Sequence, residues 1–291
     1  MARILIIGAD GAIGQALEKH LQARGDDVIG TSRREHHERA RFSLDLAAPD
    51  ISNVQLPTCD VAIVCAAMAR FADCRDNPEL ARAVNVTGPQ IIGHKVVTQG
   101  GRVIYLSSSV ALPCDRPQAP ANQPRDPHSA YGRYKADGET AILRLGNGAS
   151  IFRLTKVIQP DMPLFKGWIE ALSNGRPISA FSDLTFSPIT LHDVLNGITV
   201  TMNDGGGGIY QVSGAADPSY VDAARHLARS FGRSDAMVNP VLASENGIDA
   251  RDIVRFTSLD TSRITDLSGW HPPHYGAVLD RVFAKQQHAA S

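Results

Sequence analysis

Short runs of branched apolar residues alternate with amphipathic stretches through the first half of the chain. Residues 3–8 form an apolar run that ends in glycine, which is typical of a strand buried on both faces. Ile13, Leu17 and Leu21 then recur every four residues, so a helix is expected over residues 12–24. The same alternation predicts strands at 27–30, 60–65, 102–106 and 150–154, and helices at 78–99 and 130–145.

Strands that alternate with helices predict a parallel sheet with right-handed crossovers, which is a doubly wound α/β fold. Ligands of such folds bind at the carboxyl ends of the strands. After about residue 155 the pattern loosens, with helices expected at 220–231 and 275–287 and a flexible surface turn at the glycine run 205–208. We therefore expect a dinucleotide-binding domain over 1–158 and a smaller, mostly helical substrate-binding lobe over 159–291. A segment near 178–204 is expected to return to the first domain.

Composition narrows the choice of partners. The 29 Lys and Arg nearly balance the 30 Asp and Glu among 291 residues, so no basic excess is present to neutralise a nucleic acid backbone. The longest apolar runs fall short of the roughly 20 residues that a membrane span needs, and the N-terminus does not read as a secretory signal. The cytoplasm is therefore expected. The four cysteines match no zinc spacing and the ten histidines are scattered, so no metal is expected.

A glycine-rich turn follows the first predicted strand. Gly8 would permit the sharp turn, Gly11 would let a pyrophosphate approach the backbone, and Gly14 would let the helix pack closely on the strand. The free N–H groups at the start of that helix favour phosphate. This context predicts a Rossmann dinucleotide site, whose expected residues are Gly8, Asp10, Gly11, Ala12, Ile13 and Gly14.

The residues after the second strand bear on the choice of cofactor. NAD enzymes usually carry an acid there for the ribose 2′-hydroxyl, whereas this chain has Ser32-Arg33-Arg34. An arginine can grip a 2′-phosphate bidentately. The sequence therefore favours NADP, with NAD left open. The alternative is that Arg33 and Arg34 begin a solvated charged run.

Tyr131 and Lys135 lie four residues apart at the start of a predicted helix and so share one face. The ammonium would favour the phenolate and lower the tyrosine pKa, which suits proton exchange with a carbonyl oxygen. Serines 107–109 end a predicted strand, where a hydroxyl can stabilise a developing alkoxide. Each feature alone is common on ordinary surfaces. Together with the glycine turn, and in this order, they predict a catalytic site.

On these motifs the chain resembles the extended short-chain dehydrogenases, and within them the group similar to dTDP-4-dehydrorhamnose reductase. The resemblance implies catalytic roles for Tyr131 and Lys135, with Ser108 as the catalytic hydroxyl and Ser109 as the alternative. It also implies that further residues line the cofactor site and its surroundings, namely Ser32, Arg33, Asp45, Leu46, Ala66, Ala67 and Asn85.

The C-terminal half carries the resemblance further. Segments 186–194, 258–263 and 269–273 are similar to segments found across the group. Phe256 departs from it, because the sugar reductases tend to have proline there, and Ser108 stands where they often have threonine. The first departure puts the substrate in doubt, and the second conserves the chemistry.

The expected reaction is reduction of a keto group of a nucleotide sugar. Arg153, Ser109 and Trp168 are candidate substrate contacts, with a partly buried ion pair as the alternative for Arg153. Two other functions stay open: an epimerase or dehydratase that retains its cofactor, and a non-catalytic NADP-sensing regulatory protein. A homodimer is also possible.

Overall fold

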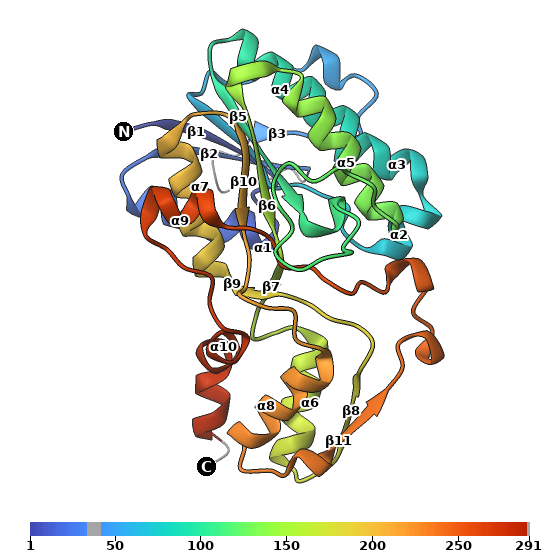
Figure 1. Cartoon of the computed structure of the whole chain (residues 1–291). Helices are drawn as coiled ribbons and strands as arrows, with labels where there is room; N and C mark the ends of the chain where they lie inside the picture. Colours follow the sequence, from blue (N-terminus) through green and yellow to red (C-terminus); the bar gives the residue numbers. More distant parts are fainter. Residues whose placement is uncertain (34–41, 290–291) are drawn as a thin grey trace. The chain divides into compact units, whose positions relative to one another are not determined.

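The computed structural model describes residues 1–33 and 42–289, and the chain forms two compact units (Figure 1). Unit 1 consists of Met1–Pro113, Pro124–Arg153 and Leu195–Gln211. Unit 2 consists of Cys114–Gln123, Leu154–Val194 and Val212–Ser291. Each unit is therefore built from three separate stretches of chain. That the second unit binds a substrate stays a prediction.

Unit 1 is built around a seven-stranded sheet in the order β10-β6-β5-β4-β1-β2-β3. The neighbours β1–β2, β1–β4, β2–β3 and β4–β5 pair in parallel. The predicted doubly wound α/β fold is thus confirmed. The strands are β1 Arg3–Ile7, β2 Asp27–Ser32, β3 Phe42–Ser43, β4 Val61–Val64, β5 Arg102–Ser108, β6 Ala149–Leu154 and β10 Gly208–Val212.

Helices cover both faces of this sheet. Figure 1 shows α4 and α5 on one face and α7 on the other, and His20 of α1 bonds with Thr199 of α7 at 3.2 Å. Within the described residues, no helix is long and apolar enough to cross a membrane. The helices of unit 1 are α1 Ala12–Ala23, α2 Phe71–Asp76, α3 Pro78–Arg82, α4 Gly88–Thr98, α5 Ala130–Leu143 and α7 Leu191–Asp204, which begins in unit 2.

The apolar core follows the alternation of side chains along each strand. Residues Leu5 and Ile7 of β1 face the helices α4 and α5, while Ile4 and Ile6, equally buried, point to the opposite face. The core between the sheet and the two helices includes Leu5, Ile7, Ala62, Val64, Ile92, Val96, Val103, Tyr105, Ile142 and Ile151.

Two segments differ from the sequence prediction. The single helix expected over 78–99 is α3 and α4 joined by a π-helical turn, Ala83–Thr87. The turn carries Asn85, and such turns are often found at functional sites. In the glycine run, Gly205, Gly207 and Gly208 have positive φ, as a turn requires, but Gly208 is also the first residue of the strand β10.

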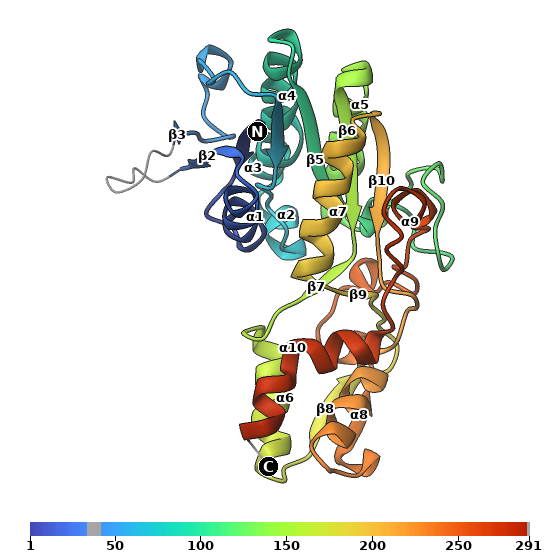
Figure 2. The same cartoon turned by 90° about the vertical axis from the view of Figure 1, so that its left-hand side faces the viewer.

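Unit 2 consists of helices and two small parallel sheets (Figure 2). Aromatic residues form the centre of its core. Phe165 and Phe186 lie at the centre, and Tyr220 packs on Phe186 with ring centroids 4.4 Å apart. Helix α8 begins with a capping box in which Ser219 and Asp222 bond each other's backbone N–H. The elements are β7 Lys156–Ile158, α6 Pro163–Ser173, β8 Ile178–Phe181, β9 Pro188–Thr190, α8 Tyr220–Ser230, β11 Val238–Val241, α9 Ser262–Ser268 and α10 Tyr275–Ala289.

One carboxylate organises the segment after residue 255 in unit 2. The Asp217 carboxylate accepts the backbone N–H groups of Thr257 at 2.5 Å and Ser258 at 2.7 Å. The stretch 114–123 is then joined to the same segment, because Ala119 donates to the Ser258 carbonyl at 3.0 Å. A stretch that follows the serine-ended strand in sequence therefore belongs to the second unit.

Helix α5 lies very close to β5 and to the π-helical turn. A Cβ on Gly138 would lie 2.5 Å from the Tyr105 hydroxyl and 2.6 Å from the Asn85 carbonyl oxygen. We expect Gly138→Ala to lower the free energy of unfolding by roughly 1–3 kcal/mol, because overpacking displaces the helix or its neighbours. Urea unfolding of the full chain measures this.

Gly167→Ala is the matched control. Gly167 lies inside α6, and no atom stands within 4 Å of its added Cβ. This substitution should stabilise the protein by about 0.5–1 kcal/mol through helix propensity alone. Equal stability of Gly138→Ala and the wild type would contradict the close approach.

Candidate active site

The glycine turn has the shape of a phosphate cradle. Gly8 has φ +87° and an added Cβ would stand 2.7 Å from the Cβ of Ala66, while a Cβ on Gly14 would stand 2.3 Å from the Gly8 carbonyl oxygen. These two glycines are therefore required by the turn itself. A Cβ on Gly11 would meet only the Gly8 oxygen, at 3.5 Å, so this position is open to a group from outside the chain.

The residues around the turn fit a dinucleotide. Gly11 is the N-cap of α1 and offers no side chain to the first N–H groups of the helix, where Ala12 is exposed. The Thr31 hydroxyl accepts the Gly8 N–H at 3.0 Å and fixes the turn against β2. At the end of β4, Ala66 is half-buried and Ala67 exposed, next to Gly8. Ile13 is half-buried in the first turn of α1.

The end of β2 carries the residues predicted to select the cofactor. Ser32 is buried and its hydroxyl donates to the Asp10 carboxylate, and Arg33 is exposed directly after it. Asp45 is exposed and accepts the Ala47 N–H at 2.9 Å, whereas Leu46 is buried. Arg34 lies outside the described residues. The preference for NADP over NAD stays a prediction.

The three serines at the end of β5 differ in their surroundings. Ser107 is buried and donates to Glu139 at 2.6 Å. Ser109 is also buried, at 4 % exposure. Ser108 is half-buried, and its hydroxyl accepts only a long bond, 3.4 Å, from the Val110 N–H. Of the three, Ser108 is the most exposed, and its catalytic role stays a prediction.

Tyr131 lies in the first turn of α5, whose start is fixed by a side-chain cap. The Ser129 hydroxyl accepts the Gly132 N–H at 3.0 Å. The Tyr131 ring stacks on Phe71 of α2, with centroids 5.7 Å apart and planes at 30°. The side chain is half-buried. The ring is therefore held in place while the residue keeps access to solvent.

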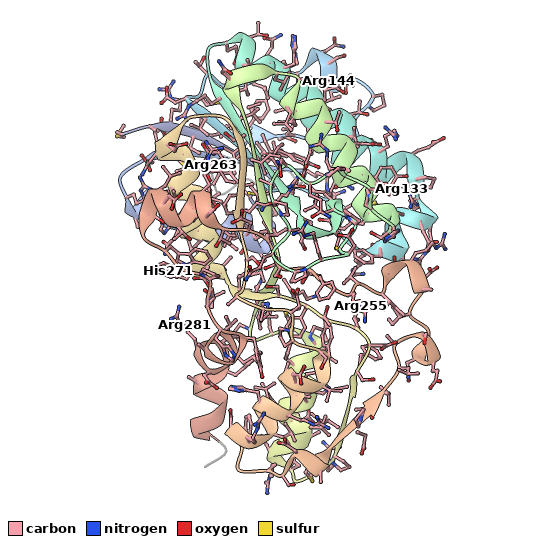
Figure 3. The ribbon with its side chains drawn as sticks, viewed as in Figure 1. Arg133, Arg144, Arg255, Arg263, His271 and Arg281 are labelled. Atoms are coloured by element: carbon pink, nitrogen blue, oxygen red, sulfur yellow. The ribbon has the colours of Figure 1, made fainter. Side chains whose placement is uncertain are left out.

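Lys135 is almost fully buried on the inner face of α5, at 1 % exposure. Its Nζ donates to the Leu106 carbonyl oxygen at 2.6 Å and lies 3.9 Å above the centre of the Tyr105 ring. The outer face of α5 carries exposed arginines instead, with Arg133 and Arg144 near its two ends (Figure 3). The catalytic lysine predicted from sequence is thus the buried cation of this helix.

The expected lowering of the tyrosine pKa is not found in this structure. Burial raises the pKa of Tyr131 above its ordinary value, and the Cys74 thiol adds to the increase. Lys135 explains the difference: burial lowers its own pKa from 10.5 to about 7, although Glu139, Cys74 and Cys65 act in the opposite direction. Lys135 does not offset the effect of burial on Tyr131, because its Nζ is directed at the Leu106 carbonyl oxygen.

Asn85 is fully buried and joins two parts of the site. Its amide accepts the Met68 N–H at 3.2 Å and donates to the Met68 carbonyl at 3.1 Å. Its own backbone carbonyl accepts the Tyr105 hydroxyl at 2.7 Å. Asn85 therefore fixes the segment after β4 and, through Tyr105, the ring beneath Lys135.

Two predicted substrate contacts have structural roles instead. Arg153 is fully buried and makes a bidentate pair with Glu139, with Nε–Oε1 2.8 Å and Nη2–Oε2 2.7 Å. The ion-pair alternative is therefore the correct one. Trp168 is buried in the core of unit 2, and its Nε1 donates to the Ser179 carbonyl at 3.1 Å. Its only polar hydrogen is thus engaged within the core.

Glu139 was missed by the sequence analysis. The feature that could have identified it is its position one helical turn after Lys135, on the same face of the helix. An acid on the buried face of a helix needs partners. Arg153 and the serine-ended strand could have been recognised as those partners only after the strand order was known.

Comparison with known proteins shows the family to which the chain belongs. Residues 2–288 match the family described as the RmlD substrate binding domain. The chain therefore belongs to this family, within the extended short-chain dehydrogenases, as the sequence resemblance predicted.

Individual relatives have related names. The chain is 26 % identical over 284 residues to the "Probable low-salt glycan biosynthesis reductase Agl14" of Haloferax volcanii, covering 92 % of this chain and 93 % of that protein. It is 28 % identical to dTDP-4-dehydrorhamnose reductase of Mycolicibacterium smegmatis, covering 82 % and 72 %. It is also 31 % identical to methionine adenosyltransferase 2 subunit beta of Xenopus laevis, covering 64 % and 53 %.

Solved structures share the fold. The dTDP-4-dehydrorhamnose reductase of Yersinia enterocolitica superimposes with a TM-score of 0.83 at 21 % identity, covering 98 % of this chain and all of that one. The Bacillus anthracis reductase, solved in complex with NADP, gives 0.80 at 22 % identity and covers 98 % of each chain.

The burial of Lys135 predicts how the free energy of unfolding changes with pH. Between pH 7 and 10.5 the unfolded chain holds the Lys135 proton and the folded protein does not, so folding is favoured as pH rises. Below pH 7 both states hold the proton and burial of the charge has its full cost. In Lys135→Met the side chain does not titrate. The stability of this variant relative to the wild type should therefore be greatest below pH 7 and fall by a few kcal/mol toward pH 10.5, at about 1.4 kcal/mol per unit.

Urea unfolding at several pH values measures this difference. Lys19→Met, at an exposed position of α1, is the matched control and should follow the wild type in parallel. A constant difference between Lys135→Met and the wild type from pH 7 to 10 would mean that the lysine stays charged in the folded protein.

Proposed function

We propose that this protein uses NADPH to reduce a keto group of a nucleotide sugar. The observation that carries the proposal is the arrangement at the carboxyl ends of the central strands. The glycine turn follows β1, Ser108 ends β5, and α5 holds Tyr131 and Lys135 against that strand. A dinucleotide cradle next to a hydroxyl, a phenol and a lysine suits proton transfer to a carbonyl oxygen.

Each side chain has a distinct part in this chemistry. Bound NADPH would supply the hydride to the substrate carbon. The Tyr131 hydroxyl would give its proton to the carbonyl oxygen, and the Ser108 hydroxyl would donate a hydrogen bond to the same oxygen. As the phenolate forms, its negative charge would favour the ammonium form of Lys135 one helical turn away. Burial of the lysine strengthens that effect, because the local dielectric is low.

The substrate class rests on the relatives. Two curated relatives are named as reductases, one of them of a dTDP-linked keto sugar, and the family is described by its substrate binding domain. Phe256, in unit 2, departs from the proline common in the sugar reductases. The identity of the keto sugar is therefore tested directly by assay.

A regulatory function is the second candidate. The observation that favours it is the relative named as subunit beta of methionine adenosyltransferase 2, at 31 % identity. A regulatory protein would bind NADPH and consume none. The held Tyr131 ring and the buried Lys135 favour the enzyme, since a sensor needs neither.

The test is NADPH oxidation by the purified protein with a panel of nucleotide 4-keto sugars and simple ketones. Consumption with a nucleotide sugar supports the reductase. A protein that purifies with firmly bound cofactor and interconverts sugars without net oxidation would be an epimerase or dehydratase. Binding of NADPH without turnover on any member of the panel would leave the regulatory function.

Tyr131→Phe is the sharpest variant for this assay. It removes one oxygen and keeps the ring that stacks on Phe71, so the fold should survive. Turnover should fall by about 10² to 10⁴ while the affinity for NADPH stays unchanged, because the hydroxyl acts in the transition state.

Tyr134→Phe is the matched control. This tyrosine lies on the same helix, and its ring packs under the Arg82 guanidinium at 5.8 Å. It should retain nearly full turnover. Loss of activity in Tyr134→Phe together with activity in Tyr131→Phe would refute the assignment.

Arg33 is expected to select the phosphorylated cofactor. NADPH should bind at least tenfold more tightly than NADH, a difference of about 1.4 kcal/mol. Arg33→Asp should weaken NADPH by more than tenfold and NADH much less, since only NADPH carries the 2′-phosphate. Fluorescence titration with both cofactors measures the two dissociation constants. Arg144→Asp makes an equal charge change at an exposed position at the end of α5, and it should alter neither dissociation constant. Equal affinities of the wild type for NADPH and NADH would contradict the role of Arg33.

A further inference from the structure

A second group of ionisable residues lies buried directly behind the candidate catalytic pair. Glu139 has no exposed surface, and its Oε1 accepts the Ser107 hydroxyl at 2.6 Å and Arg153 Nε at 2.8 Å. Its Oε2 accepts Arg153 Nη2 at 2.7 Å and Arg125 Nη1 at 3.3 Å. Both carboxylate oxygens thus have two donors each, which is the condition for an ionised acid in an apolar interior.

This network reaches the strands and the helix of the site. Arg153 is on β6, and its Nη1 donates to Gln211 of β10 at 2.9 Å. Ser107 is the neighbour of both Ser108 and Leu106, whose carbonyl holds the Lys135 ammonium. Glu139 lies four residues after Lys135 on α5. One carboxylate therefore fixes the helix that carries Tyr131 and Lys135 against the end of the strand that carries Ser108.

We propose that Glu139 is a positioning residue for the catalytic pair: its buried carboxylate favours the charged form of Lys135 and holds α5 in place against the end of β5. The proposal rests on the proposed function only for its catalytic consequence. The effect of Glu139 on the charge of Lys135 is a property of the protein alone and is measured without a substrate.

The groups around Lys135 explain why Glu139 has a large effect on its charge. The groups that face it are Cys74 from α2, Cys65 from the end of β4, Tyr105 from β5, and Glu139 on its own helix. Burial is the main cause that lowers the pKa of Lys135, and Glu139 is the strongest of the groups that raise it. Arg153 and Arg125 pair with the carboxylate and partly balance its charge.

The experiment is a pH titration of Lys135 by NMR in the full chain labelled with ¹³C at lysine Cε, with the signal assigned by its loss in Lys135→Met. The wild type should titrate near the pKa of about 7 found for Lys135. Glu139→Gln keeps the shape and removes the charge, and its midpoint should lie about one unit lower, the size expected from loss of a nearby opposite charge. An unchanged midpoint in the folded variant overturns the proposal.

Two further variants separate charge from packing. Asp137→Asn removes an acid from the exposed face of the same helix, where it pairs with Arg82 at 2.8 Å, and should leave the midpoint unchanged. An equal downward shift in Asp137→Asn would mean that the helix responds to any lost acid, which contradicts a specific role of Glu139. Glu139→Gln/Arg153→Gln replaces the ion pair by two amides, so no buried charge of the pair is left unpaired. It covers the case in which Glu139→Gln alone does not fold. Its midpoint should fall by less than in Glu139→Gln, because a positive charge is removed together with the negative one.

The catalytic consequence is read from the pH dependence of kcat/KM. If protonated Lys135 is required, the alkaline limb should move to lower pH in Glu139→Gln by the same amount as the NMR midpoint. A loss of kcat with no movement of the limb would indicate a merely structural role. If the NMR midpoint moves and no substrate is turned over by the wild type, the proposed reaction fails and the effect of Glu139 on Lys135 stands.

Discussion

Three ionisable side chains, Lys135, Glu139 and Arg153, are buried together where α5 crosses β5 and β6. Removing a charge from water costs several kcal/mol unless hydrogen bonds and opposite charges compensate for it. Here the compensation is unequal. Glu139 and Arg153 satisfy each other in a bidentate pair, whereas Lys135 has one carbonyl oxygen and the face of a tyrosine ring. Burial therefore lowers the pKa of Lys135 to about 7. The other residues of the candidate site surround this lysine.

The close packing of α5 makes this burial possible. Gly138 allows the helix to approach Tyr105 and Asn85, and the Tyr105 hydroxyl is held by the Asn85 carbonyl. The ring of Tyr105 then forms the floor beneath Lys135. The π-helical turn that carries Asn85 stabilises this arrangement. It directs a backbone carbonyl at β5 and a side-chain amide at the segment after β4. The positions of the π-helical turn, the Tyr105 ring and Lys135 therefore depend on one another.

Local sequence patterns predicted those features that depend on neighbours in the chain. The strand–turn–helix of Gly8, Gly11 and Gly14, the helix of Tyr131 and the sheet class all follow from periodicity and from steric limits within a few residues. The strand β10 was not predicted, because a glycine run has no periodicity and the strand exists only through pairing with β6. The partner of Arg153, Glu139, and the direction of the Tyr131 pKa could not be predicted either. Both depend on burial and on partners that lie far away in the sequence.

The order of the strands also has a consequence for biosynthesis. Unit 1 receives its last strand from residues 208–212, which pair beside β6 long after the other six strands have been made. A nascent chain that has emerged only as far as residue 158 therefore exposes β6 as an unpaired sheet edge and lacks Gln211, the partner of Arg153. Such edges invite association with other chains. Because the stretch Leu154–Val194 of unit 2 must be synthesised before β10 can close the sheet, the charged interior of unit 1 stays incomplete during part of synthesis. We expect the nascent chain to depend most on chaperones at that stage.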